Sequence, residues 1–160
     1  MSAVKFTPGK NRLAKVMRLP GGTTVRSALK DVKRNLEMIR RDCIAEIDIK
    51  LGLIQQACAQ GEERPSDADL DQLYRMSNDI VGMAGLFDMV ELGEAAYSLC
   101  ELVDRLKASD QWDWPAVEVH LSGLRLLRRA KPGAPENQHV LAGLRKLTAR
   151  VDARREMGTA

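Results

Sequence analysis

The sequence predicts an all-α protein built as an antiparallel helical bundle. Its 160 residues are enough for one domain with a core of its own. Hydrophobic residues make up 44% of the chain and aromatic residues only 4%, so aliphatic side chains must fill that core. Apolar positions recur at spacings of three and four, and no strand, hairpin or repeat pattern is present. Long helical patterns joined by short loops are typical of a bundle.

The chain begins with a segment, residues 1–24, that is predicted to be a basic arm. Eleven Lys/Arg and two acids give residues 1–41 a net charge of +9. Residues 42–124 carry five Lys/Arg and seventeen acids (−12), and residues 125–160 carry nine and three (+6). The arm is either a disordered tail or a short helix over residues 10–19 that forms on docking. The basic ends can pair with the acidic middle, fold back on it, or reach an acidic partner.

The first long helix is predicted over residues 25–59, with Gly61 as its C-terminal cap. Its apolar residues share one face, which we expect to be buried along its whole length. These residues are Val32, Leu36, Ile39, Cys43, Ile47, Leu51, Ile54 and Cys58.

Four more helices follow. Ser66 and Asp69 form a capping-box pattern at the start of the second helix. Helices are then predicted over residues 90–108, from just after Asp113 and Pro115 to residue 130, and over residues 136–156. The KPGAP sequence of residues 131–135 separates the last two. Residues 25–156 thus form the predicted bundle, and residues 157–160 a tail. The expected inward positions are Leu70, Leu73, Ser77, Ile80 and Ala84; Leu92, Ala96, Leu99, Val103 and Leu106; Val117, Leu121, Leu124 and Leu127; and Leu141, Leu144, Leu147 and Val151.

Residues 73–92, LYRMSNDIVGMAGLFDMVEL, are the most informative stretch. Helical periodicity places Asn78 off the core face of the second helix. Counted from Asn78, the pattern is Arg75 at −3, Ile80 at +2, Val81 at +3, Gly82 at +4, Ala84 at +6, Phe87 at +9, Glu91 at +13 and Leu92 at +14. This frame resembles the signature of histidine-containing phosphotransfer (HPt) domains. In that family an exposed His is followed by Leu, Lys, Gly and a small residue, and Glu-Leu opens the next helix.

The resemblance implies a four-helix-bundle core of HPt type, here with an extra or split last helix. It also exposes two departures, because Asn78 stands at the phosphohistidine position and Val81 at the usual Lys. An amide nitrogen is not nucleophilic near neutral pH, whereas an imidazole is. The missing Lys would have offset phosphate charge. Asp79 and Asp88 flank the site and would repel a phosphoryl group, and Asp88 replaces a usual Gly.

What the frame retains is a surface that we expect to bind a protein. Residues three and four apart share a helix face. The predicted interface consists of Tyr74, Arg75, Asn78, Val81, Gly82, Met83, Gly85 and Leu86. Gly82 would let a partner's backbone approach. The alternative is that Gly82 and Gly85 pack against a neighbouring helix or loosen the helix end. The expected function is a bacterial phosphorelay module that binds a response-regulator receiver domain without phosphotransfer, with a histidine kinase as a further candidate partner.

Other functions stay open. An ordinary phosphotransfer protein would need His120 or His139, each expected to be a partly exposed helix histidine. The basic arm and the last two helices could bind nucleic acid or another anionic surface, although balancing the acidic middle is the favoured interpretation. The basic residues of these helices are Arg125, Arg128, Arg129, Lys131, Arg145, Arg150, Arg154 and Arg155. Trp112 and Trp114 either anchor a partner or close one end of the bundle.

The remaining patterns argue against an enzyme. No Walker loop, Rossmann fingerprint, nucleophile elbow or zinc-protease motif is present. The acidic run around residues 62–71 lacks EF-hand spacing and suits a helix N-terminus, so we expect no metal and no cofactor. Cys43, Cys58 and Cys100 form no CxxC pair, and with no secretory signal or membrane span they indicate free thiols in the cytoplasm.

Overall fold

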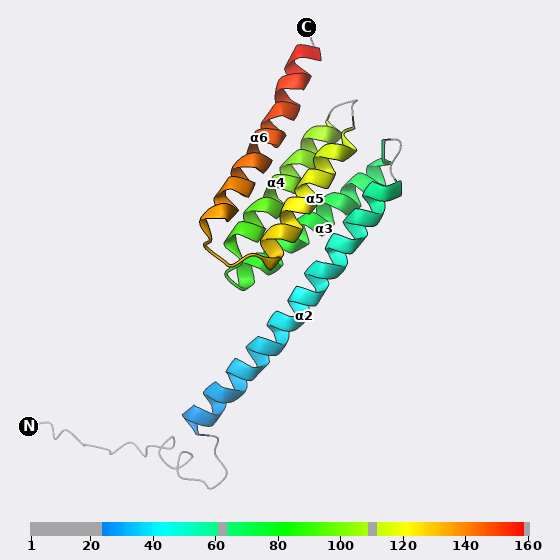
Figure 1. The fold of residues 1–160 in the computed structure, drawn as a ribbon. Helices are drawn as coiled ribbons and strands as arrows, with labels where there is room; N and C mark the ends of the chain where they lie inside the picture. Colours follow the sequence, from blue (N-terminus) through cyan, green and yellow to red (C-terminus); the bar gives the residue numbers. More distant parts are fainter. Residues whose placement is uncertain (1–23, 61–63, 109–111, 159–160) are drawn as a thin grey trace, which may run out of the picture. The chain divides into compact units, whose positions relative to one another are not determined.

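The computed structural model describes residues 24–60, 64–108 and 112–158, and these form five helices with no strand among them (Figure 1). The predicted arm lies outside the described residues except for Thr24, as do residues 159 and 160 of the tail. The helices are α2 Val25–Gln60, α3 Asp67–Leu86, α4 Val90–Lys107, α5 Trp114–Arg129 and α6 Pro135–Gly158. The all-α prediction is confirmed, and each helix agrees with its predicted range to within a few residues. No described helix combines the length and the apolar character that a membrane crossing requires.

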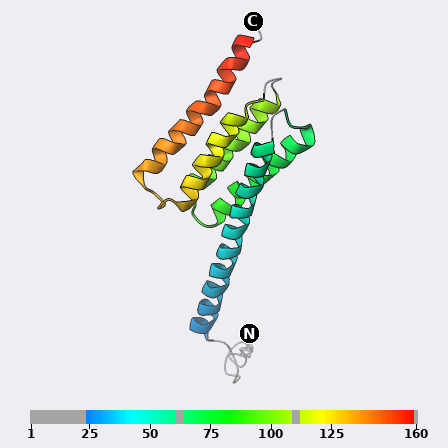
Figure 2. The same cartoon turned by 45° about the vertical axis from the view of Figure 1, so that its right-hand side comes forward.

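The chain divides into two compact units, residues 1–39 and residues 40–160. In the second unit, α4 packs against α3, α5 and α6, and α5 also packs against α6. Consecutive helices from α3 to α6 run in opposite directions (Figure 2). The core is aliphatic, as the composition requires, and it includes Ile54 of α2, Ile80 of α3, Leu99 of α4, Leu124 of α5 and Leu141 of α6.

Local sequence explains the helix boundaries. Ser66 caps α3 in a capping box with Asp69, since each side chain accepts the other residue's backbone N–H. Asp113 caps α5 by accepting the N–H of Ala116 at 3.0 Å. Gly133 takes a positive φ of 75° in the turn before α6, where glycine is unstrained.

The buried positions predicted from helical periodicity agree with the structure in most of the bundle but not along the whole of α2. In α3, α4 and α5 every predicted inward residue is buried, and in α6 only Leu147 is half-buried rather than buried. In α2 the expectation of a continuous buried face is wrong. Ile47, Leu51, Ile54 and Cys58 are buried, but Val32, Leu36 and Ile39 are exposed. Periodicity identifies residues that share a face, and a second element must be present to cover it.

Candidate functional site

The predicted docking face lies on α3, and its central residue, Asn78, is exposed as expected. Its i−1 neighbour Ser77 is buried and donates a hydrogen bond to the carbonyl of Leu73 at 2.9 Å. Ile80 is fully buried on the opposite face. Because these two inward contacts fix the rotation of α3, Asn78 must point away from the core.

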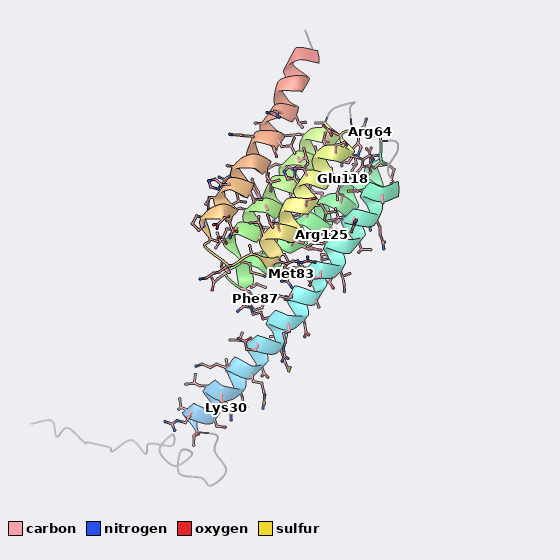
Figure 3. The ribbon with its side chains drawn as sticks, in the orientation of Figure 1. Lys30, Arg64, Met83, Phe87, Glu118 and Arg125 are labelled. Carbon is pink, nitrogen blue, oxygen red and sulfur yellow. The ribbon has the colours of Figure 1, made fainter. Side chains whose placement is uncertain are left out.

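The other predicted interface residues are either half-buried or exposed. Tyr74, Val81 and Met83 are half-buried and pack against the core. Arg75, Gly82, Gly85 and Leu86 are exposed. We call the eight predicted interface residues the Asn78 surface. Packing against the core holds its half-buried members in place. Figure 3 labels Met83 near the C-terminal end of α3, next to Phe87.

The two glycines of this surface have open space around them. A Cβ atom added at Gly82 or Gly85 would meet no described atom within 4 Å. Close packing against a neighbouring helix therefore does not explain either glycine. Gly85 precedes the last residue of α3, so the other explanation, that it loosens the helix end, still applies to this glycine. Gly82 lies well inside the helix, where glycine costs about 1 kcal/mol relative to alanine.

Asp79, which was expected to repel a phosphoryl group, is hydrogen bonded to a lysine of another helix. Its Oδ2 accepts a hydrogen bond from Lys50 Nζ of α2 at 2.8 Å, and Lys50 also lies 3.3 Å from Glu46. The hydrogen bond to Asp79 raises the pKa of Lys50, and partial burial opposes that rise. Lys50 thus places a cation from a different helix beside Asp79, the residue that follows Asn78. Sequence spacing gave no sign of this residue, because the contact joins positions far apart in the chain.

The loop after α3 holds the second acidic departure from the HPt pattern. Asp88 has a positive φ of 57°, in the left-handed region that favours glycine. Aspartate tolerates this conformation better than most residues. The backbone thus keeps the shape that a glycine would adopt, even though the residue is charged. Met89 N–H closes the loop on the carbonyl of Ala84 at 3.1 Å.

Glu91, which stands at the Glu of the Glu-Leu pattern, is hydrogen bonded to the turn between α5 and α6. Its Oε1 accepts the N–H of Gly133 at 2.6 Å and lies 3.4 Å from Asn137 Nδ2, which also donates to the carbonyl of Lys131 at 3.0 Å. Backbone hydrogen bonds, first from its own N–H and then from Gly133, lower the pKa of this carboxyl group. Glu91 therefore links the start of α4 to the connection that separates the last two helices.

The α4 side of the Asn78 surface adds apolar area that the sequence analysis missed. Tyr97 is 59% exposed and Val90 61%, and Leu86 at the end of α3 is 72% exposed. An open groove of about 480 Å³ lies beside Val81 and Tyr97. Its far wall includes Arg145 of α6, which is bonded to Glu94 of α4 at 2.7 Å. The groove is thus lined by the apolar Val81, by Tyr97 and by the ion pair of Glu94 and Arg145.

His120 is fully buried, which contradicts the expectation of a partly exposed histidine. Its Nδ1 donates to the carbonyl of Ala116 at 2.9 Å. Its Nε2 lies 3.1 Å from Ser98 Oγ and 3.2 Å from Thr148 Oγ1, so a hydroxyl group donates to it. Burial lowers the pKa of His120, opposed in part by the Ala116 carbonyl. The network joins α4, α5 and α6 through a neutral imidazole.

The basic faces of the last helices are partly engaged with the rest of the bundle. Arg128 of α5 pairs with Asp48 of α2 at 3.0 Å. Arg125 donates to Gln55 of α2, and Figure 3 labels it on α5 where that helix faces α2. With the Arg145–Glu94 pair, these contacts agree with the interpretation that the basic faces balance the acidic middle.

The remaining candidate sites have structural roles. Trp112 and Trp114 meet edge to face, with ring centroids 5.1 Å apart, and both pack against the core. Of the acidic run, Asp69 completes the capping box of α3 by accepting the N–H of Ser66, and Asp71 pairs with Lys107 at 2.6 Å. Within the part of the chain that the structure describes, no group of three or more His, Cys, Asp or Glu residues gathers as metal ligands would.

No protein-family model, no curated protein and no solved structure matches this chain. The likeness to HPt domains thus rests on the residues of α3 and the following loop.

Proposed function

We propose that this chain is an HPt-like signalling module that binds a response-regulator receiver domain through the Asn78 surface and passes no phosphate through Asn78. The observation that carries the proposal is Gly82, an interior helix glycine on an exposed face. It stands one turn from the exposed Asn78, and no described atom would touch its Cβ. A partner whose backbone comes close to α3 would account for a residue that internal packing does not require.

The chemistry of the site supports docking without transfer. Phosphoryl transfer needs a nucleophile, and the amide of Asn78 is not one. Val81 supplies no cation, and the ammonium group of Lys50 is already paired with Asp79 and Glu46. A receiver domain bound here would keep its phosphate. The module would then sequester its partner, hold it in place or bias its conformation.

The near alternative, phosphotransfer through another histidine, depends on His139. His120 is ruled out as an accessible nucleophile because it is fully buried and both ring nitrogens are hydrogen bonded. His139 is exposed on α6. It lacks the Leu-Lys-Gly pattern that follows the family's histidine, so we rank it second.

Two glycines with matched surroundings provide the test. Gly82 on α3 and Gly143 on α6 are both exposed, and an added Cβ at either meets no described atom within 4 Å. Binding to a panel of receiver domains is measured for the wild type, Gly82→Arg and Gly143→Arg. We expect one receiver to bind, Gly82→Arg to weaken that binding at least about tenfold, and Gly143→Arg to leave it unchanged. Equal effects of both substitutions, or no binding to any receiver, would refute docking at this surface.

A further inference from the structure

The N-terminal part of α2, within the unit of residues 1–39, carries an exposed apolar seam. Thr24 caps this helix, since its Oγ1 accepts the N–H of Ser27 at 3.2 Å. Every residue of the seam is at least half exposed. The seam consists of Val25, Leu29, Val32, Leu36 and Ile39. Val32, Leu36 and Ile39 were expected to be buried, and no described residue covers the seam.

The spacing of the seam is that of a coiled coil. Successive members are four, three, four and three residues apart, which is the alternation of d and a positions in a heptad repeat. Cys43 continues the pattern at the next a position. The following steps, to Ile47 and then Leu51, are four and four, and those two residues are buried in the bundle core. The heptad pattern therefore stops where the helix enters its own bundle.

We infer that this seam packs against the same seam of other copies of the chain in a parallel coiled coil. A strict a/d seam is narrower than the apolar face that a helix presents to a globular core. A helix lying on a membrane also needs a broad apolar face, so the width of the seam argues for another helix as its partner.

The charges on either side of the seam favour a second copy of the chain as the partner and a parallel arrangement of the two helices. The three e positions are Arg26, Lys33 and Arg40, and the g positions between them are Ala28 and Asn35. In a parallel pair each e residue faces a g residue of the other chain, so no two cations meet. An antiparallel pair would set the basic e residues against one another. The arm is an unsuitable occupant, because residues 1–24 hold five Lys/Arg and no acid beside a segment that is itself basic.

The identity of the seam residues also bears on the number of chains. Leu29 and Leu36 occupy a positions, and Val25, Val32 and Ile39 occupy d positions. Leucine at a with a β-branched residue at d favours more than two strands in parallel coiled coils. Trimers or tetramers are therefore expected over dimers.

Sedimentation equilibrium of the full chain tests the inference with a matched pair of substitutions. Leu36 in the seam is 53% exposed, and Met38, two residues on and outside the seam, is 49% exposed. We expect wild type and Met38→Lys to sediment as oligomers of the 17.8 kDa chain and Leu36→Lys as a monomer. A monomeric wild type, or an oligomer that survives Leu36→Lys, would overturn the inference. So would a monomer whose seam instead binds vesicles containing anionic lipid.

Cross-linking through Cys43 tests the direction of the chains. Parallel chains bring the Cys43 residues together, whereas antiparallel pairing over residues 25–43 would separate them by about 27 Å at 1.5 Å per residue. Cys58 and Cys100 are buried and do not compete. A short bis-maleimide should therefore link wild type and Met38→Lys but not Leu36→Lys. An oligomer that does not cross-link would refute the parallel arrangement. Added salt should strengthen the assembly by screening its positive charge, whereas binding to nucleic acid would weaken.

Discussion

Lowering the pH should destabilise the bundle through His120. The unfolded chain takes up a proton near the ordinary histidine pKa of 6.5, and burial holds the folded pKa below that value. The unfolded state therefore binds more protons between the two values, so the stabilisation is complete above pH 6.5 and is lost as the pH falls through the folded pKa. One proton gives a slope of at most about 1.4 kcal/mol per pH unit.

The structure sets the size of the effect and its control. Protonation would turn Nε2 from an acceptor into a donor, facing the hydroxyl groups of Ser98 and Thr148. Between pH 6.5 and about 5, the free energy of unfolding should fall by up to about 2 kcal/mol. His120→Gln, which cannot titrate, should be less stable at neutral pH by about 1–3 kcal/mol because its hydrogen bonds are incomplete.

Urea denaturation followed by circular dichroism measures both quantities at each pH. Carboxylates such as Glu91 titrate alike in the two proteins, so the difference between their slopes isolates His120. The chain concentration must be fixed, because self-association would make stability depend on it. Parallel pH profiles for wild type and His120→Gln would refute this account of the network.

Four further outcomes are expected. Gly82→Ala should stabilise the protein by about 1 kcal/mol in urea denaturation, because its Cβ enters open space. Gly123→Ala should destabilise it by about 1 kcal/mol or more, because its Cβ would lie 3.0 Å from the buried Leu144 Cδ1; the same sign for both would contradict the packing described. Asp88→Gly should raise stability by up to about 1 kcal/mol at its φ of 57°, a gain that a strain-free Asp88 would not give. In Leu36→Lys, which is expected to be monomeric, native thiol labelling near pH 8 should modify Cys43 first, because burial raises the pKa of each of the other two thiols to about 11. Equal rates would show that the core opens readily.

The sequence was a good guide to local structure. The cap at Ser66, the break before Pro135 and the inward faces of α3, α4 and α5 all follow from residues a few positions apart. The outward position of Asn78 also followed from periodicity alone. Such features depend on helix geometry, which spacing encodes directly.

Contacts between residues far apart in the chain could not be predicted from the sequence. Lys50 bonds to Asp79 across 29 positions, and Ser98 meets Thr148 across 50. His120 looked ordinary because nothing near it in the chain provides its hydroxyl partners. The seam residue Leu36 was misjudged for a related reason, since an apolar face shows that a helix has a partner but not whether that partner belongs to the same bundle.

We propose that the Asn78 surface docks a receiver domain without taking its phosphate. The most direct measurement charges the bound receiver with acetyl phosphate and follows phosphate on the wild type and on Asn78→His. We predict that the wild type binds the receiver and gains no phosphate, whereas Asn78→His gains acid-labile phosphate at the new histidine. Phosphate on the wild-type chain, retained in Asn78→Ala and lost in His139→Ala, would contradict the account and identify an ordinary phosphotransfer protein.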